Sequence, residues 1–290
     1  MKYYLLLFAI ALTSCSKEDN NPVPPVTPLS VDALIINDAE FTGSTKFAVG
    51  QYLRIVPSVS SSSSDLNFSW TLNPGDGESI KNSKGELSWR PAKTKEYALA
   101  VNVKSGSGEE TSSKYKLSVI PADIRYYLWG ARRADVEYTE YASSSEKADT
   151  AGGYVEFLVN HSDIEYGRKD ALQPGEYIAY GFENDVLTSA NVFIVVQKPT
   201  DPKEYKEKYE AIKSRLSDYN YLGNENKWLE GNDEAMKYKD TPERLGEAFA
   251  KGYVTLSDHF ENERTNVTLV MLGRHEDGTV LMGIYYSQKK

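Results

Sequence analysis

The sequence predicts a mainly β protein, in which a β-sandwich is followed by an α+β domain made of an antiparallel sheet with two helices. Residues 29–121 alternate between apolar and polar side chains and contain no stretch of helical period, as expected for the short strands of a sandwich. Residues 122–290 contain further alternating segments and then apolar residues three and four positions apart, which is the spacing of a helix face. Two alternating segments end the chain and predict a hairpin.

Composition and charge limit the possible functions. The length of 290 residues suits two domains. Thirty-three Lys and Arg residues against 42 Asp and Glu residues give a net charge of −9, so we expect no nucleic-acid partner, because phosphates need a basic surface. The single cysteine excludes an intramolecular disulfide and a cysteine-based zinc site. No apolar run reaches the roughly 18–20 residues that cross a bilayer.

The first fifteen residues have the pattern of an export signal. Lys2 supplies a positive charge, residues 3–12 form a short apolar run, and Cys15 follows as the chain's only cysteine. We interpret residues 1–14 as a lipoprotein signal peptide. The alternative is an ordinary signal peptide in which the cysteine occurs by chance.

The residues around Cys15 resemble the signals of bacterial lipoproteins. Residues 12–15, Leu-Thr-Ser-Cys, resemble a lipobox, in which the cysteine is acylated and becomes the mature amino terminus. Several acyl chains hold a protein stably on a membrane. Residues 16–20 resemble the export tag of Bacteroidetes lipoproteins, although a solvated charged linker would look similar. We therefore expect a lipid-anchored outer-membrane protein facing the exterior, with residues 15–28 as a proline-rich spacer.

Residues 29–121 predict the sandwich. The segments 66–72, 97–103 and 115–119 alternate in polarity, and turn residues cluster at 60–65, 73–77, 82–85 and 105–108. Trp70 lies on the apolar side of its segment. We therefore expect Trp70 in the core between the two sheets.

This segment resembles a PKD domain. Phe68-Ser69-Trp70 followed by the turn Pro74-Gly75-Asp76-Gly77 resembles the tryptophan strand and Gly-Asp-Gly turn of that family, and residues 96–119 resemble its closing hairpin. The spacing at residues 71–73 departs from the family's usual form, so we describe the domain as PKD-like. The resemblance implies an Ig-like sandwich of the kind found in secreted and surface proteins. Asp76 is expected to bond the local backbone rather than calcium.

Residues 122–290 predict the α+β domain, and we recognise no family in it. The predicted strands are 124–129, 135–141, 153–159, 176–182 and 190–197, with a run of turn residues at 143–153. Apolar residues at helical spacing then follow between Tyr205 and Tyr219. Asp201, Pro202 and Glu204 are typical of a helix start. A shorter helix is predicted from Thr241 to about Gly252, and the final hairpin pairs 267–273 with 279–287.

Motifs for catalysis are scarce. His161, His259 and His275 do not have metal-ligand spacing, and no serine elbow or phosphate loop occurs. We therefore single out no catalytic residue, no metal ligand and no cofactor. A pair of carboxylates could still meet in space, as in glycoside hydrolases. The carboxylates on or near predicted strands are Glu137, Glu140, Glu156 and Glu165.

Tyrosine is abundant, with 21 residues, most of them after residue 120. Tyr285 and Tyr286 are adjacent in a predicted strand and should point to opposite faces. Tyr219, Tyr221 and Trp228 lie in an asparagine-rich stretch after the first helix, and we expect them to bind a ligand, because exposed rings with polar edges suit recognition of sugars or proteins. The alternative is that these rings are ordinary, half-buried strand residues.

The preferred function is a non-enzymatic surface module for binding or adhesion, which recognises a glycan or a partner protein through residues 122–290. Two other functions stay open. One is a surface glycan-processing hydrolase with unidentified carboxylates, and the other is a structural subunit of a surface or fimbria-like assembly.

Overall fold

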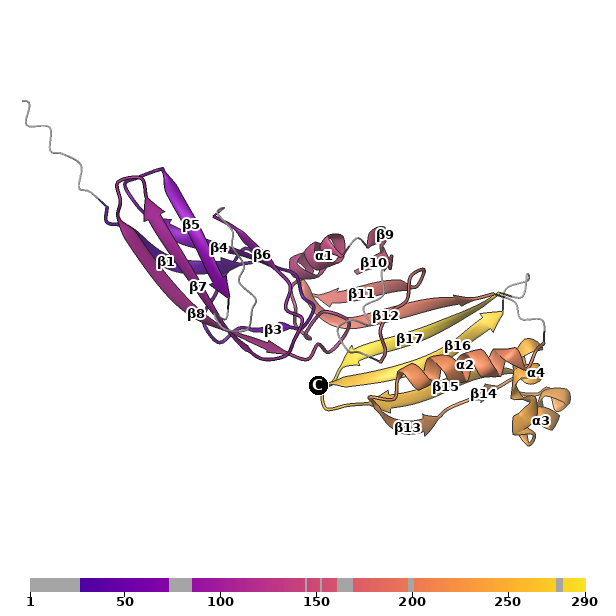
Figure 1. Ribbon diagram of the computed structural model, residues 1–290. Coiled ribbons are helices and arrows are strands. Elements are labelled where there is room, and N and C mark those ends of the chain that lie inside the picture. The colour runs from indigo at the N-terminus through magenta and orange to yellow at the C-terminus, as the bar shows by residue number, and fades with distance from the viewer. Residues whose placement is uncertain are drawn as a thin grey trace, which may run out of the picture.

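The computed structural model describes residues 27–72, 85–143, 145–151, 153–160, 169–197, 201–274 and 279–290. Within them the chain is mainly β, as the sequence predicts, and forms two four-stranded sheets and one nine-stranded sheet (Figure 1). One hydrophobic core runs from Leu34 to Val119 and a second from Ile124 to Tyr286. No helix in these ranges is long and apolar enough to span a bilayer. Residues 1–26, which include the expected signal peptide, Cys15 and most of the expected spacer, lie outside the described residues.

The two four-stranded sheets form the N-terminal sandwich. Their strand orders are β2-β1-β4-β6 and β3-β8-β7-β5, and only β3 and β8 run parallel. The strands are β1 (Ser30–Ile36), β2 (Ala39–Glu40), β3 (Lys46–Ala48), β4 (Leu53–Ser60), β5 (Leu66–Leu72), β6 (Leu87–Trp89), β7 (Glu96–Ser105) and β8 (Glu110–Ile120). Trp70 is 2% exposed and lies in the core, which confirms its predicted position. The turn with Asp76 lies outside the described residues.

The nine-stranded sheet is antiparallel throughout and has the order β13-β15-β16-β17-β12-β11-β10-β9, with β14 also paired to β15. Its strands are β9 (Glu146–Ala151), β10 (Tyr154–Leu158), β11 (Tyr177–Glu183), β12 (Val186–Val196), β13 (Asn220–Asn224), β14 (Lys227–Trp228), β15 (Val254–Glu261), β16 (Thr265–Arg274) and β17 (Val280–Gln288). The final hairpin, β16 with β17, confirms the prediction.

Helices cover one face of this sheet (Figure 1). They are α1 (Arg133–Ala142), α2 (Glu204–Arg215), α3 (Asp233–Lys239), the short 3-10 helix η2 (Pro242–Arg244) and α4 (Leu245–Ala250). Helix α2 begins at Glu204 with Lys203 as its N-cap, two residues later than an N-cap at Asp201 would give. Asp201 still forms two bonds just before the helix: its N–H donates to Glu204 Oε1 (3.1 Å) and its Oδ1 accepts the Lys203 N–H (2.9 Å). The two bonds satisfy two amide groups at the helix entrance.

Two predicted strands of the second domain are wrong. Residues 135–141 belong to α1, whose buried side chains are Val136, Thr139 and Glu140. Only Val136 among them is apolar, so the buried face of this helix gives no hydrophobic period in the sequence. Residues 124–129 form a turn closed by an isolated bridge between Ile124 and Tyr127. The turn-rich run 143–153 contains β9, and the structure also adds α3, β13, β14 and β15 to the predicted elements.

Candidate binding surface

The first predicted site residue, Tyr219, is part of the core and not of an exposed loop. Its side chain is 8% exposed, and its hydroxyl donates to Asp170 Oδ2 (3.0 Å). The Tyr286 hydroxyl donates to the same oxygen (3.4 Å). The Tyr219 side chain is therefore buried and its hydroxyl is bonded within the fold, so it is not available to a ligand.

Tyr221 and Trp228 lie on edge strands β13 and β14. Their register partners on β15 are Phe260 and Val254, which belong to the buried cluster. The Tyr221 ring is 49% exposed, but its hydroxyl donates to Asp258 Oδ1 (2.8 Å). Trp228 is half-buried against the core. The asparagine-rich stretch is thus a sheet edge whose aromatic rings turn toward the core, and the three residues do not form one exposed surface.

The opposite face of the sheet differs, and we call it the open face. The helix residues Tyr205, Tyr209 and Ile212 pack in the same cluster as one set of alternating strand positions, so the other set points away from the helices. On β10, β11, β12 and β17, which are neighbours in this sheet, the open-face positions are Tyr154, Glu156, Leu158, Tyr177, Ala179, Gly181, Glu183, Val186, Ser189, Asn191, Phe193, Val195, Leu281, Gly283, Tyr285 and Ser287.

Two glycines allow tyrosine rings to lie down on the open face. A Cβ placed on Gly283 would come within 2.7–2.9 Å of the end of the Tyr285 ring, and one placed on Gly181 would come within 2.8 Å of the Tyr154 ring. Each tyrosine ring therefore lies over a glycine, in the space that a side chain at that position would otherwise fill. A ring that lies against the sheet on one side presents its other side outward.

Phe193 and Tyr177 extend this aromatic area. The Phe193 ring meets Tyr285 edge to face, with ring centres 6.4 Å apart at 89°. A shallow groove of about 380 Å³ continues from there, lined by Glu156, Tyr177, Phe193, Val195 and Leu281. Within the described residues, the hydroxyls of Tyr154, Tyr177 and Tyr285 have no hydrogen-bond partner. The open face thus combines flat apolar area with unused polar groups.

Among the described residues, the candidate carboxylates Glu137 and Glu156 do not form a catalytic pair. Glu137 is ion-paired with Arg133 (3.2 Å) and Lys147 (3.6 Å). Glu156 lies alone in the groove of the open face, and Glu165 lies outside the described residues. In the described part of the chain, no cluster of His, Cys, Asp and Glu could hold a metal ion.

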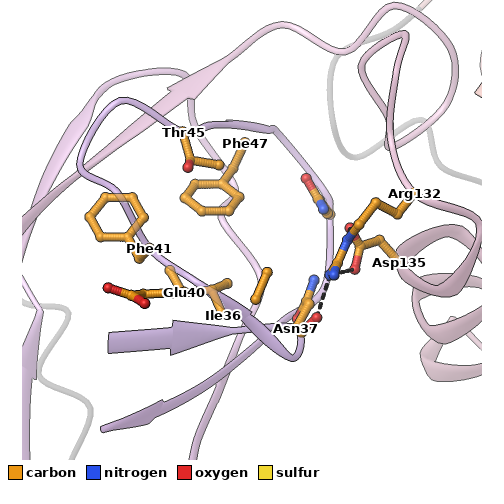
Figure 2. Close-up of a pocket in the computed structure, with 10 residues that line it drawn as sticks. Ile36, Asn37, Glu40, Phe41, Thr45, Phe47, Arg132 and Asp135 are labelled. Carbon is orange, nitrogen blue, oxygen red and sulfur yellow. Dashed lines mark hydrogen bonds and ion pairs between the residues drawn. The ribbon is translucent and has the colours of Figure 1, made fainter. Parts of the chain in front are cut away.

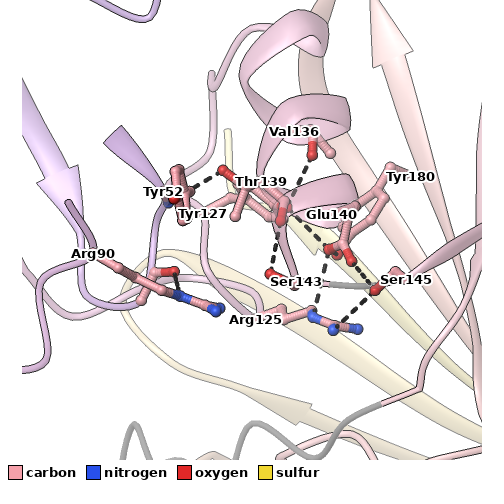
Figure 3. Close-up of polar contacts among 11 residues, drawn as sticks. Tyr52, Arg90, Arg125, Tyr127, Val136, Thr139, Glu140, Ser143, Ser145 and Tyr180 are labelled. Atoms are coloured by element: carbon pink, nitrogen blue, oxygen red, sulfur yellow. Dashed lines mark hydrogen bonds and ion pairs between the residues drawn. The ribbon is translucent and has the colours of Figure 1, made fainter. Parts of the chain in front are cut away.

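Glu140 is fully buried in a polar network (Figure 3). Its Oε1 accepts hydrogen bonds from Tyr127 (2.9 Å) and Tyr180 (2.6 Å), its Oε2 accepts one from Ser145 (2.8 Å), and Arg125 Nε lies 3.4 Å from Oε1. Burial raises the pKa of both tyrosines well above the ordinary value. A carboxylate saturated in this way stabilises the fold and has no substrate within reach.

A small pocket separates the sandwich from α1 (Figure 2). Its volume is about 90 Å³, which holds only a few water molecules. The Arg132 guanidinium donates to both oxygens of Asp135 (2.7 and 3.0 Å) and also to the Asn37 carbonyl of the sandwich. Burial raises the pKa of Asp135 in spite of this pairing. Arg132 and Asp135 are thus paired with each other, and Arg132 also links α1 to the sandwich, so these two residues act as a joint between the domains.

Comparisons with known proteins do not identify the chain. It matches no protein-family model and no curated protein. Among solved structures it is similar to the extracellular domain of a protein described as a hybrid two component system from B. thetaiotaomicron (9% identity, 34% of this chain and 16% of that chain, TM-score 0.26). The chain spans about a sixth of the length of the first two such structures.

Two further similar structures are carbohydrate-binding proteins. One is a carbohydrate-binding module of the β-sandwich superfamily (9% identity, 89% of this chain and 93% of that chain, TM-score 0.25). The other is the protein SGBP-B of a Bacteroides ovatus mixed-linkage glucan utilization locus, in complex with a heptasaccharide (13% identity, 89% and 47%, TM-score 0.23). TM-scores in this range do not show a common fold, so the function must be sought in the geometry of this chain.

Proposed function

We propose that this chain is a non-enzymatic surface protein that binds a glycan on the open face of its nine-stranded sheet, with Tyr285 and Phe193 at the centre. The observation that supports this proposal most strongly is the Tyr285 ring, which lies over Gly283 beside the Phe193 ring. A sugar ring has an apolar face of C–H groups and a rim of hydroxyls. It is matched by a flat aromatic ring surrounded by hydrogen-bonding groups.

Polar side chains that could bond the hydroxyls of a sugar lie beside Tyr285 on the two neighbouring strands. Asn191 on β12 and Thr268 on β16 are its register partners on either side. Both residues are half-buried, so their side chains are partly held in place before a ligand arrives. Such pre-ordering lowers the entropy that binding must overcome.

The proposed placement at the cell surface rests on the sequence. In this proposal acylated Cys15 tethers the chain to the outer membrane, residues 15–28 act as a spacer, and the PKD-like sandwich of residues 29–121 holds residues 122–290 away from the bilayer. The contacts at the joint support a fixed spacing, since the Tyr52 N–H donates to Thr139 Oγ1 (3.3 Å) and the Tyr52 ring meets that of Tyr138 (5.6 Å between centres).

A comparison of two tyrosine variants tests the glycan-binding proposal. Full-length Tyr285→Ala should bind its polysaccharide about tenfold more weakly than the unmodified chain, equivalent to about 1.4 kcal/mol, which is within the range of a lost aromatic contact. The matched control is Tyr221→Ala, which removes an exposed tyrosine from the helix-covered side. Its affinity should be unchanged.

Affinity electrophoresis in gels that contain a series of polysaccharides would supply the measurement. Thermal unfolding of each variant shows whether the fold persists. If Tyr221→Ala loses binding and Tyr285→Ala retains it, the edge that carries Tyr221 is the site and the open face is not. If neither unmodified nor variant chain binds any polysaccharide, the glycan proposal fails.

A further inference from the structure

The open face carries acidic but no basic residues on β10, β11, β12 and β17, which affects the kind of glycan it can accept. None of its positions on β10, β11, β12 and β17 is a lysine or an arginine. Its carboxylates there are Glu183, exposed at the end of β11, and Glu156, half-buried in the groove beside Tyr177 and Phe193. The groove therefore has negative charge with no basic group among these positions to balance it.

Glu156 is also unlike the other partly or fully buried carboxylates of this domain. Glu140, Asp170 and Glu176 each accept hydrogen bonds from side chains of the fold. Glu156 has no hydrogen bond or ion pair with any described residue. Its carboxylate is thus free to accept hydrogen bonds from a ligand in the groove, and two neighbouring sugar hydroxyls match its two oxygens.

Resting on the proposed function, we infer that Glu156 is a specificity-determining residue that makes the open face select uncharged glycans over anionic ones. A neutral sugar would donate two hydroxyls to the carboxylate. A uronate or sulfate group in the same place would meet a like charge in a partly desolvated groove, where repulsion is stronger than in bulk water. The acidic net charge of the chain acts in the same direction.

The test compares the full chain with Glu156→Gln on three kinds of probe: neutral β-glucan, xylan and mannan, anionic polygalacturonate and alginate, and cationic chitosan. The unmodified chain should bind at least one neutral polymer at least tenfold more tightly than either anionic polymer. Glu156→Gln keeps the shape of the side chain but removes its charge. The Glu156→Gln variant should bind the neutral polymer several-fold more weakly, and its preference for neutral over anionic polymers should be smaller than that of the unmodified chain.

Salt provides a second readout that a merely structural role would not change. The preference of the unmodified chain should shrink between 0.05 and 0.5 M NaCl as charges are screened, since the Debye length falls below about 10 Å above 0.1 M. The preference of Glu156→Gln should depend less on salt. Glu243→Gln is the matched control, because it makes the same change in net charge at an exposed residue of η2 and should behave as the unmodified chain does.

The outcomes separate this inference from the proposed function. Tight binding of polygalacturonate or alginate that depends on Tyr285 would overturn the role of Glu156 and leave the open face as the glycan site. Preference for chitosan over every neutral polymer would also overturn it, since the carboxylate would then act as a counter-charge. Absence of Tyr285-dependent binding to all three kinds of probe would instead reject the proposed function itself.

Discussion

The two faces of the nine-stranded sheet both carry tyrosines, but they use the hydroxyl groups differently. On the helix-covered face, Tyr127 and Tyr180 donate to Glu140, and Tyr219 and Tyr286 donate to Asp170. On the open face, tyrosine rings lie across glycines, and their hydroxyls contact no partner among the described residues. A high tyrosine content therefore does not by itself indicate a binding surface. The tyrosines available to a ligand are those whose hydroxyl the fold leaves unused.

The difference has a physical cause. A tyrosine in the core must have its hydroxyl satisfied, because an unpaired buried polar group costs about 1–3 kcal/mol. The covered face satisfies its tyrosines with buried carboxylates, and these carboxylates gain hydrogen bonds in return. The open face needs no such partner, since water or a ligand can supply the bond.

Removing Glu140 should have the largest effect on stability. Glu140→Ala leaves Arg125 buried without its carboxylate and Tyr127 and Tyr180 without an acceptor. We expect a loss of about 3–5 kcal/mol in the free energy of unfolding, as for other broken buried pairs. Chemical denaturation measures it. Glu137→Ala, on the same helix but half-exposed, is the control and should cost about 1 kcal/mol or less. Equal losses in the two variants would show that the network is not a core element.

Removing one hydroxyl from each face should distinguish the faces directly. Tyr219→Phe removes a bond to the carboxylate of Asp170 and should cost about 1.5–3 kcal/mol of stability. Tyr285→Phe removes a hydroxyl that has no partner in the described residues and should leave the unfolding midpoint in urea unchanged. A loss of stability for Tyr285→Phe as large as that for Tyr219→Phe would contradict the division between the faces.

Alkaline pH should weaken the covered face through Tyr180. Its pKa is raised well above the ordinary value of about 10 because burial disfavours the phenolate. Above pH 10 the unfolded chain releases this proton while the folded chain keeps it, so stability falls as pH rises, by about 1.4 kcal/mol per pH unit for each such tyrosine. Tyr180→Phe should show a slope shallower by that amount in denaturation curves between pH 10 and 11.5. Parallel slopes would mean that Tyr180 does not keep its proton on folding.

Displacing the Tyr285 ring should have the smallest effect. In Gly283→Ala the added Cβ would lie 2.7–2.9 Å from the end of that ring, so the ring must tilt away from the strand. We expect polysaccharide binding to weaken by a few-fold with little change in stability, because only the tip of one side chain moves. Affinity electrophoresis would detect the change. An unaltered affinity would show that the flat position of the ring does not matter for binding.

Much of the fold could be predicted from the sequence, but the site could be predicted only in part. A strand such as residues 97–103 can be predicted because apolar and polar residues alternate along it, so that one face is apolar and the other polar. Helix α1 cannot, since it buries Thr139 and Glu140, and only the tertiary partners of Glu140 make that burial favourable. The adjacent residues Tyr285 and Tyr286 point to opposite faces, as the sequence predicts: Tyr286 is 1% exposed and its hydroxyl donates to Asp170.

The expected site at Tyr219, Tyr221 and Trp228 rested on polar neighbours in the sequence. Asparagines in that stretch mark a sheet edge, and the rings between them turn toward the core. The flat position of the Tyr285 ring depends on Gly283 two residues earlier on the same strand. A Gly-x-Tyr pattern in a predicted strand is the sequence signal that could have pointed to it. Which face the helices cover is a matter of long-range packing, and no local pattern reveals it.

The claim that the ligand binds on the open face can be checked by mapping amide chemical shifts in the full chain. During titration with a neutral polysaccharide fragment, the amides of β11, β12 and β17 near Tyr177, Phe193 and Tyr285 should shift together and saturate at one affinity. Shifts confined to β13 and β14, around Tyr221 and Trp228, or to the pocket around Arg132, would contradict the claim.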